Sequence, residues 1–264
     1  MKEFRGKVAV VTGAASGIGR ALALRCAAEN MQVVVADIEE SALGRVETEL
    51  KDSGANTLAV LTDVSNAEDV ETLARKTLER FGAVHLLCNN AGIGAGSTAW
   101  ESTLKDWEWT LGVNLWGVIH GLRAFVPAML EQDSESHIVN TASVAGLISF
   151  HLNAPYQVSK HAVVGLSEKL HYDLEARAAK VKVSVLCPGW VRTRIMDSHR
   201  NRPAELENDP AEVEITPEMM DAVEGYRQAC ESGIPPEKVL SLTSSYESGW
   251  RPCCRAVIRC RLKN

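Results

Sequence analysis

The sequence predicts an α/β protein built on one doubly wound parallel sheet with helices on both faces. Short apolar runs rich in β-branched residues recur along the chain, and longer segments with helical periodicity separate them. Runs that are apolar throughout are typical of strands buried on both faces of a parallel sheet. We expect six strands, at Lys7–Thr12, Gln32–Ala36, Thr57–Leu61, Val84–Cys88, His137–Ala142 and Lys182–Leu186.

The segments between these runs have the lengths of crossover helices. We expect helices at Arg20–Met31, Glu39–Ser53, Ala67–Phe81, Leu104–Met129 and Tyr156–Ala178. Strands that alternate with such helices pair in parallel, and ligands then bind at the carboxyl ends of the strands. Candidate functional residues are therefore sought where each strand ends.

Composition narrows the function classes. A chain of 264 residues with 45% hydrophobic content suits one domain with a sizeable core. A formal charge of −6 argues against a nucleic-acid partner, and no apolar run approaches the length of a membrane span. The N-terminus lacks a signal-peptide core, so we expect a cytoplasmic protein. Seven cysteines without paired CxxC spacing predict free thiols, and no metal site is expected.

A glycine turn follows the first strand and opens the first helix. Its spacing is GxxxGxG, and the candidate dinucleotide-binding residues are Gly13, Ser16, Gly17, Ile18 and Gly19. Glycines let the backbone approach a pyrophosphate, and a helix N-terminus offers unpaired N–H groups and a favourable dipole. A glycine turn alone is a weak signal, but the flanking strand and helix favour the phosphate-binding interpretation.

The second strand ends in Asp37, eighteen residues after Gly19. An acid there can accept both hydroxyls of an adenosine ribose and would repel a 2′-phosphate. No lysine or arginine lies in the glycine turn or beside Asp37 in the sequence. NAD is therefore favoured over NADP, although a solvated aspartate or a helix cap remains the alternative for Asp37.

Further polar residues mark the ends of the third and fourth strands. Asp63 and Val64 follow the third strand, and the fourth leads into Asn90, Ala91 and Gly92. Since Gly13, Asp37, Asp63 and Asn90 all follow strands, we expect four separate segments to meet in one crevice.

A serine, a tyrosine and a lysine after the fifth strand form the candidate catalytic group. Ser143 stands thirteen positions before Tyr156, and Tyr156 four before Lys160, so a helix would set the last two on one face. A phenol is a poor base at neutral pH, and a neighbouring ammonium is expected to lower its pKa. Ser143 could hydrogen-bond the substrate oxygen that Tyr156 protonates or deprotonates.

Asn114 lies within an apolar helical stretch, where an unpaired amide is costly. Two interpretations stay open: a core amide that bends the helix, or a side-chain or backbone site that orders a water near the active site.

Taken together, these motifs resemble the short-chain dehydrogenase/reductase family over roughly residues 5 to 195. The resemblance implies one Rossmann-like domain and hydride transfer between a nicotinamide and a carbinol or carbonyl carbon. By analogy Tyr156 is the general acid/base, Ser143 orients the substrate oxygen, and Lys160 binds the nicotinamide ribose. It further implies that Asn114 holds a water of a proton relay. Asp63 and Val64 would flank the adenine, and Asn90, Ala91 and Gly92 the adenosine side. Contacts with the nicotinamide would come from Pro188, Gly189, Val191 and Thr193.

The substrate side is expected to be apolar. A lid at about 194–235 follows the nicotinamide loop, and Ala145 and Trp190 join Ser143 and Tyr156 as candidate substrate residues. Other predicted lining residues are Ile93, Leu147, Phe150 and Leu152. We expect a small hydrophobic secondary alcohol or its ketone as the partner.

The C-terminal residues 241–264 depart from the family pattern. A catalytic domain of residues 1–240 would end in an atypical tail with three cysteines and five bases against one acid. The family forms oligomers and builds one of its subunit interfaces at this end, so the resemblance implies a homodimer or homotetramer. Whether the atypical tail allows that interface is left open.

Two other function classes stay open. A dinucleotide-binding redox sensor without turnover would need no catalytic group, and an epimerase or dehydratase of the same family would show no net change in NADH. We expect instead an NAD-dependent oxidoreductase.

Overall fold

The computed structural model of the chain describes residues 3–151, 153–210 and 216–241. Most of the predicted tail, residues 242–264, lies outside these ranges, as does the predicted lining residue Leu152.

Six parallel strands form one sheet, in the order β3-β2-β1-β4-β5-β6. The strands are β1 Val8–Thr12, β2 Gln32–Asp37, β3 Thr57–Leu61, β4 Leu86–Asn89, β5 Ser136–Thr141 and β6 Val181–Leu186. Each lies within about two residues of its predicted position, and the predicted fold class is confirmed. The order of the strands reverses next to β1, at the β1–β4 boundary, which is where such sheets bind ligands.

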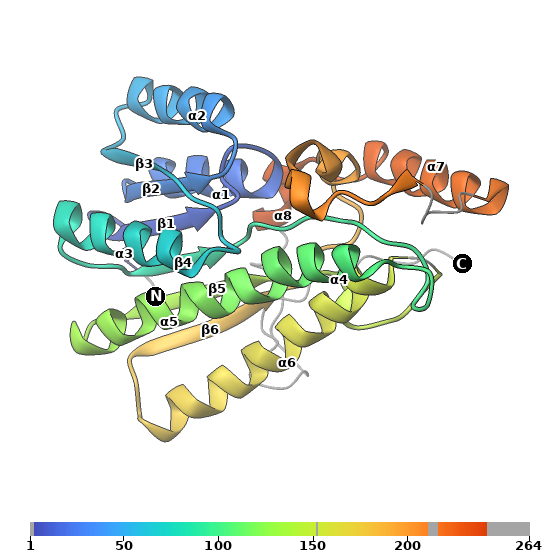
Figure 1. Cartoon of the computed structure of the whole chain (residues 1–264). Coiled ribbons are helices and arrows are strands. Elements are labelled where there is room, and N and C mark those ends of the chain that lie inside the picture. The colour runs from blue at the N-terminus through green and yellow to red at the C-terminus, as the bar shows by residue number, and fades with distance from the viewer. Residues whose placement is uncertain (1–2, 152, 211–215, 242–264) are drawn as a thin grey trace.

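Helices cover both faces because alternate residues of the central strands point to opposite sides. Figure 1 shows helices on both sides of the sheet. Val8 and Val10 pack with α3 (Ala67–Phe81) and α5 (Gly117–Glu131), while Ala9 and Val11 pack with α1 (Gly17–Ala28) and α2 (Glu40–Asp52). All four side chains are fully buried, which is why these strands are apolar throughout. The helices of the two layers are α1 Gly17–Ala28, α2 Glu40–Asp52, α3 Ala67–Phe81, α5 Gly117–Glu131 and α6 Ala154–Ala176.

The predicted helix at 104–129 is interrupted. It consists of α4 Leu104–Leu111, a π-helical turn at Gly112–Trp116, and α5. A π-helical turn inserts one residue into the helix and is often found at functional sites. Asn114 lies within this turn, so the polar residue in the apolar stretch marks the irregularity.

The joined stretch Leu104–Glu131 is also long and apolar enough to cross a membrane, which the sequence alone had not indicated. One such helix is weak evidence of a membrane span, and part of this one packs against the sheet, where Phe125 and Met129 are fully buried.

The start of α6 is defined by local sequence. Asn153 precedes it with a positive φ of 57°, a conformation that asparagine tolerates better than most residues. Pro155 follows in the first turn, where its fixed φ favours a helix and its missing N–H costs nothing. This start sets Tyr156 and Lys160 in the first two turns of α6.

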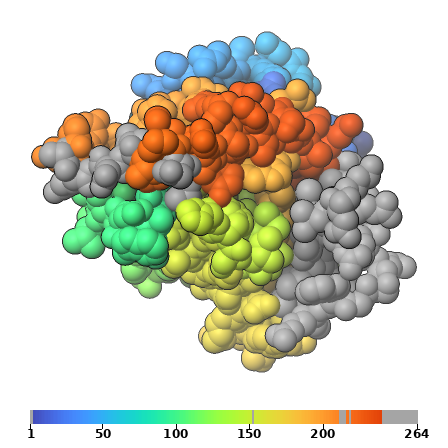
Figure 2. Space-filling model, turned by 90° about the vertical axis from the view of Figure 1, so that its right-hand side faces the viewer, coloured from blue at the N-terminus to red at the C-terminus, as the bar shows by residue number. Residues whose placement is uncertain are grey.

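After β6 the chain crosses the carboxyl edge of the sheet. This segment contains short 3₁₀ turns at Ile195–Asn201 and Ala204–Leu206, then α7 Pro217–Glu231 and α8 Pro236–Ser241. A parallel bridge between Val191 and Ile234 ties its two ends together. In Figure 2 its orange and red atoms form a ridge above the yellow-green atoms that precede α6.

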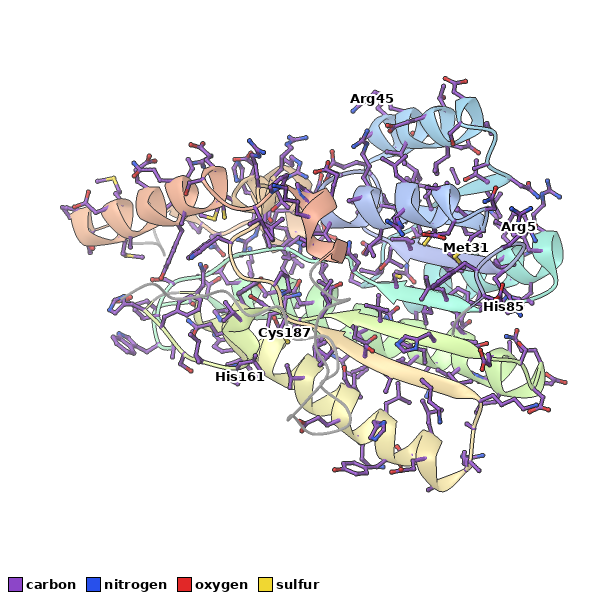
Figure 3. The ribbon with its side chains drawn as sticks, turned by 180° about the vertical axis from the view of Figure 1, so that it is seen from behind. Arg5, Met31, Arg45, His85, His161 and Cys187 are labelled. Carbon is purple, nitrogen blue, oxygen red and sulfur yellow. The ribbon has the colours of Figure 1, made fainter. Side chains whose placement is uncertain are left out.

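Three labelled residues mark the two ends of the strands. Figure 3 shows Met31 and His85 where strands begin and Cys187 where β6 ends, on the side of the crossing segment. The four cysteines of the described part, Cys26, Cys88, Cys187 and Cys230, are buried and form no disulfide with one another.

Candidate active site

A cleft of about 970 Å³ runs along the carboxyl ends of the strands. It is lined by residues that follow each of the six strands, including the segment after β6. Its volume lies at the upper end of the range for small-molecule and cofactor sites. The predicted meeting of Gly13, Asp37, Asp63 and Asn90 in one crevice is borne out, since all four line this cleft.

Ser143 lies directly after β5 in extended conformation and begins a short 3₁₀ turn. Its hydroxyl accepts a hydrogen bond from the Ala145 N–H at 3.1 Å. The next residue, Val144, donates its N–H to the Pro188 carbonyl at 2.9 Å, which fixes the turn to the loop after β6. Val144 and Leu147 line the cleft, whereas Ala145 is buried below its wall. Ala145 therefore positions Ser143, and the substrate contact predicted for it does not follow from this geometry.

Tyr156 and Lys160 lie one turn apart on α6 and both line the cleft, as predicted. The Lys160 Nζ lies 5.5 Å from the centroid of the Tyr156 ring. Lys160 is only 3% exposed, and its ammonium donates to the Thr141 carbonyl at 3.0 Å. Burial lowers the pKa of Lys160 to about 8.

The pKa of Tyr156 differs from the sequence-based expectation. Burial raises it, and a hydrogen bond with Ser143 offsets only part of that rise. The Nζ of Lys160 lies beside the ring and is bonded to the Thr141 carbonyl. Burial raises the pKa of the phenol and lowers the pKa of the lysine, because it disfavours the charged form of both groups.

The side chain of Asn114 does not line the cleft. Its Oδ1 accepts from the Ile93 N–H at 2.8 Å, and its Nδ2 donates to the Ile93 carbonyl at 3.0 Å and to the Ser159 hydroxyl at 3.0 Å. Both amide hydrogens are thus used. The side chain fixes the loop after β4 to α6, as the core-amide interpretation predicts for a residue in the π-helical turn. The interpretation as a backbone site for a water stays a prediction.

The glycine turn is shaped for close approach. A Cβ on Gly19 would lie 2.0 Å from the Gly13 carbonyl oxygen, and one on Gly13 would lie 2.7 Å from the Ala91 Cα. Gly19 does not line the cleft; it lets the helix pack against the turn. Ser16 stands at the N-cap position of α1 but its side chain makes no capping hydrogen bond, and the first turn of α1 holds no acid. The N–H groups of this turn therefore give the N-terminus of α1 a partial positive charge, which suits a phosphate.

Thr12 and Thr141, which the sequence did not single out, hold the central loops. The Thr12 hydroxyl accepts from the N–H groups of Asn90 and Ala91 at 2.9 and 3.1 Å. The Thr141 hydroxyl donates to the Asn90 Oδ1 at 3.2 Å, and its carbonyl holds Lys160. A Cβ on Gly92 would lie 3.3 Å from both Lys160 Nζ and Asn114 Oδ1, so a side chain there would push these two groups aside by a few tenths of an ångström.

Asp37 faces the glycine turn. Its carboxylate accepts from the Ala15 N–H at 2.8 Å and from the Glu39 N–H at 3.0 Å. Burial raises its pKa, although these two hydrogen bonds act in the opposite direction. Two oxygens hold four lone-pair positions, so Asp37 keeps acceptor capacity toward the cleft.

Two arginines that are far from Asp37 in the sequence lie at the same corner of the cleft in the fold. Arg194 and Arg200 line the cleft together with Asp37 and Glu39. The expectation that no arginine lies beside Asp37 holds along the chain but not in space.

The remaining predicted cofactor residues also line the cleft. Ile18, Asp63, Val64, Pro188, Gly189, Val191 and Thr193 all do so, as do Ser16 and Gly17. The Thr193 methyl would lie 3.1 Å from a Cβ on Gly17, so the loop after β6 closes against the glycine turn.

An aromatic cluster of Phe150, Trp190 and Tyr226 lines one end of the cleft. The Tyr226 ring stacks on Trp190 at 5.7 Å and lies 6.1 Å from Phe150. Its hydroxyl bonds to the His151 carbonyl, which joins α7 to the loop before α6. Ile93, Leu147 and Met196 also line the cleft, so its predicted apolar lining is present.

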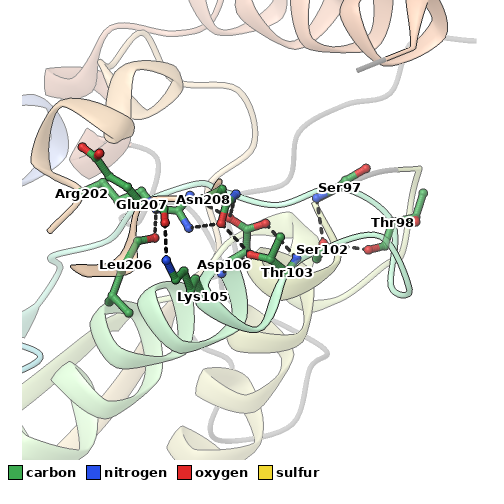
Figure 4. Close-up of polar contacts among 10 residues, drawn as sticks. All are labelled: Ser97, Thr98, Ser102, Thr103, Lys105, Asp106, Arg202, Leu206, Glu207 and Asn208. Carbon is green, nitrogen blue, oxygen red and sulfur yellow. Dashed lines mark hydrogen bonds and ion pairs between the residues drawn. The ribbon is translucent and has the colours of Figure 1, made fainter. Parts of the chain in front are cut away.

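A buried ion pair anchors the segment after β6 to the start of α4. Arg202 donates to the Asp106 Oδ1 at 2.7 Å, to the Leu206 carbonyl at 2.6 Å and to the Asn208 Oδ1 at 2.9 Å (Figure 4). Asn208 in turn accepts from the Thr103 hydroxyl at 2.7 Å, and Thr103 and Asp106 form the capping box of α4. The guanidinium lies 5.0 Å from the centre of the Trp109 ring. This network fixes residues 202–208 as one wall of the cleft.

Comparison with known proteins agrees with this geometry. A family model described as short chain dehydrogenase matches residues 7–204. A short-chain dehydrogenase/reductase from Burkholderia phymatum, solved in complex with NAD, is 48% identical, with a TM-score of 0.88 over 92% of this chain and 86% of that one.

Curated relatives point the same way. The CLA biosynthesis dehydrogenase/reductase of Lactiplantibacillus plantarum is 36% identical over 80% of this chain and 74% of that protein. The 1-deoxy-11-beta-hydroxypentalenate dehydrogenase of Streptomyces arenae is 40% identical over 72% of this chain and 69% of that protein. The chain belongs to the short-chain dehydrogenase/reductase family of oxidoreductases.

Proposed function

We propose that this chain is an NAD-dependent oxidoreductase that transfers a hydride between the nicotinamide and a hydrophobic secondary alcohol or ketone. The observation that carries the proposal is the grouping of the Ser143 hydroxyl, the Tyr156 phenol and the buried Lys160 ammonium at one cleft with a partly apolar wall.

The residues present fit a dinucleotide. The uncapped first turn of α1 and the absence of side chains at Gly13 and Gly19 leave room for a pyrophosphate beside backbone N–H groups. Asp37 would bind the hydroxyls of the adenosine ribose, and Asp63 and Val64 would flank the adenine. Pro188, Gly189, Val191 and Thr193 would hold the nicotinamide end. When bound, the nicotinamide accepts or supplies the hydride.

The protein's own part is the proton. Tyr156 takes the hydroxyl proton when an alcohol is oxidised and returns it to the oxygen when a ketone is reduced. Ser143 donates a hydrogen bond to that same oxygen and fixes its distance from Tyr156. Lys160, whose pKa is lowered to about 8 by burial, is a cation close to its titration point and would bind the nicotinamide ribose.

Tyr156 needs help to act as a base at neutral pH, because burial raises its pKa. A positive charge brought to the cleft beside the phenol favours the phenolate. We propose that Lys160 and the oxidised cofactor together supply that charge, and that the backbone carbonyl of Asn114 holds the water through which the proton leaves.

The aromatic cluster supports an apolar substrate. Phe150, Trp190 and Tyr226 join the cleft wall to α7, so residues 194–235 would act as a lid over the substrate. Trp190 would contact the substrate directly, since it is 42% exposed and lines the cleft.

The test is NADH absorbance while a panel of secondary alcohols and ketones is offered with NAD(H) and with NADP(H). Turnover linked to NAD with apolar substrates would support the proposal. NADH binding without turnover across the panel would favour a redox sensor, and product formation without a net NADH change would favour an epimerase or dehydratase.

We also propose that the chain is a homodimer or homotetramer. Trp116, Val158 and Tyr172, on the π-helical turn and α6, are each about half exposed despite their apolar surface. Light scattering on the purified chain tests this, and a monomer at micromolar concentration would contradict it.

A further inference from the structure

An ion pair joins the segment after β6 to the end of β2, at the corner of the cleft that holds Asp37. We call residues 194–201 of this segment the strap. Arg200 donates to Glu39 Oε1 through both Nε and NH2, at 3.0 and 2.5 Å. Asn201 donates to the same oxygen at 3.0 Å. The side chains of Arg200 and Glu39 are 25% and 22% exposed, so this pair is more protected than the other arginine–acid contacts on the surface of the sheet layers.

Arg200 is also held from its own side. Its NH1 donates to the Arg194 carbonyl at 3.2 Å and to the Asp197 carbonyl at 2.7 Å. These contacts lie within the strap and do not involve Glu39. The guanidinium would therefore keep its place if the charge of Glu39 were removed, and the edge formed by Nε and NH2 would lose its charged acceptor.

Glu39 is linked to Asp37 at the same corner. The Glu39 N–H donates to the Asp37 Oδ1. Burial is the main cause of the raised pKa of Asp37, and the negative charge of the Glu39 carboxylate raises it further. Burial raises the pKa of Glu39 itself, but the hydrogen bonds from Asn201 and Arg200 outweigh this and keep it lowered. Two carboxylates, rather than one, thus face this end of the cleft.

We propose that Glu39 is a cofactor-specificity residue: it occupies the phosphate-binding edge of Arg200 and adds a second negative charge beside Asp37, and so excludes the 2′-phosphate of NADP. This rests on the proposed dinucleotide function of the cleft. An arginine edge with two parallel N–H groups is suited to bidentate binding of phosphate, and here that edge is bound to a carboxylate instead.

The sequence pattern around Asp37 thus gives only half of the discrimination. The other half comes from the pairing of Glu39 with Arg200, which lies 161 positions after Glu39 in the chain. Removing the charge of Glu39 both lowers the repulsion and exposes a cation, so its effect on NADPH should exceed its effect on NADH.

The experiment is titration of NADH and of NADPH, by calorimetry or nicotinamide fluorescence, into the wild-type chain and three variants. The readout is the ratio of the NADPH to the NADH dissociation constant, in which any change in pyrophosphate binding cancels. Glu39→Gln keeps the size and an acceptor oxygen, and we expect it to lower this ratio by about tenfold. In Glu39→Gln combined with Arg200→Leu most of this gain should be lost.

Arg200→Leu alone provides a second arm that does not depend on Glu39→Gln. It leaves the Glu39 carboxylate uncompensated, so the ratio should rise above the wild-type value. The matched control is Glu49→Gln, because Glu49 also binds Nε and NH2 of an arginine, Arg20, but neither residue lines the cleft. Its ratio should equal that of the wild type.

The proposal is overturned if Glu39→Gln and Arg200→Leu bind NADH and leave the ratio unchanged, or if both nucleotides weaken in parallel. A wild-type chain that binds neither nucleotide would instead overturn the proposed function, and this inference with it. The two failures are distinguished by the wild-type NADH titration alone.

Discussion

The ammonium group of Lys160 lies 5.5 Å from the centroid of the Tyr156 ring and is bonded to the Thr141 carbonyl, not to the phenol. The two side chains are one helical turn apart, and the cleft they share buries the lysine almost completely. A buried cation bound only to a neutral carbonyl is costly for the fold. Such a residue is better explained by a function in the cleft than by stability.

A first prediction concerns the pH dependence of stability. Burial lowers the pKa of Lys160 from 10.5 to about 8 in the folded chain, so the unfolded chain binds more protons between these values. The contribution of Lys160 to stability is therefore fully present above pH 10.5 and is lost as the pH falls through about 8.

Urea unfolding of the wild type and Lys160→Met tests this at several pH values. The wild type should gain on the order of 1–3 kcal/mol relative to the variant between the lower and upper ends of that window. Parallel stability curves for the two proteins would contradict the assigned shift.

A second prediction concerns the glycine turn. In Gly19→Ala the new Cβ would meet the Gly13 carbonyl at 2.0 Å, so the turn must shift. We expect NADH affinity to fall by at least about tenfold, since a displaced loop loses its N–H contacts with the phosphates. Calorimetric titration measures this.

Gly44→Ala is the matched control for that substitution. Gly44 lies within α2, and no atom outside its own stretch of helix lies within 4 Å of where a Cβ would be, so alanine should stabilise the helix by about 0.5–1 kcal/mol and leave NADH binding unchanged. Equal losses of NADH affinity in both variants would show that the effect is not specific to the turn.

A third prediction concerns the anchor of the cleft wall. Asp106→Asn leaves the buried Arg202 without its charged partner, and breaking a buried pair typically costs about 3–5 kcal/mol. We expect a lower free energy of unfolding and a higher KM for the substrate, because residues 202–208 lose their attachment to α4. NADH affinity should change less than KM.

Asp133→Asn provides the comparison for that variant. Asp133 pairs with Lys180 on the surface, with side chains 77% and 54% exposed. An exposed pair contributes at most about 1 kcal/mol, so its loss should leave both stability and KM near wild type. If the two variants behaved alike, the Asp106–Arg202 pair would have no special role.

Local sequence was sufficient for the sheet and for most of the cleft. Apolar runs, glycine spacing and polar residues after strands depend on neighbours in the chain, and they placed Gly13, Asp37, Asn90 and Tyr156 at the same edge. The start of α6 was predicted to within two residues, at Tyr156 instead of Ala154, because Pro155 acts locally.

Other features depend on long-range packing and could not be predicted in this way. The π-helical turn gives Asn114 its bonds to Ile93 and Ser159, which are 21 and 45 positions away in the chain. The pairing of Arg200 with Glu39 requires the strap to cross the sheet edge. The raised pKa of Tyr156 depends on burial, which spacing does not reveal.

The most direct test of the central claim is Tyr156→Phe, which removes one oxygen from the cleft and leaves the ring. With a substrate identified from the panel, the account predicts a fall in kcat of at least about 10²-fold, because the proton donor and acceptor is lost. NADH affinity should remain within about threefold of wild type, since the ring still packs in the cleft. Near-normal turnover by Tyr156→Phe would contradict the assignment of Tyr156 as the general acid/base.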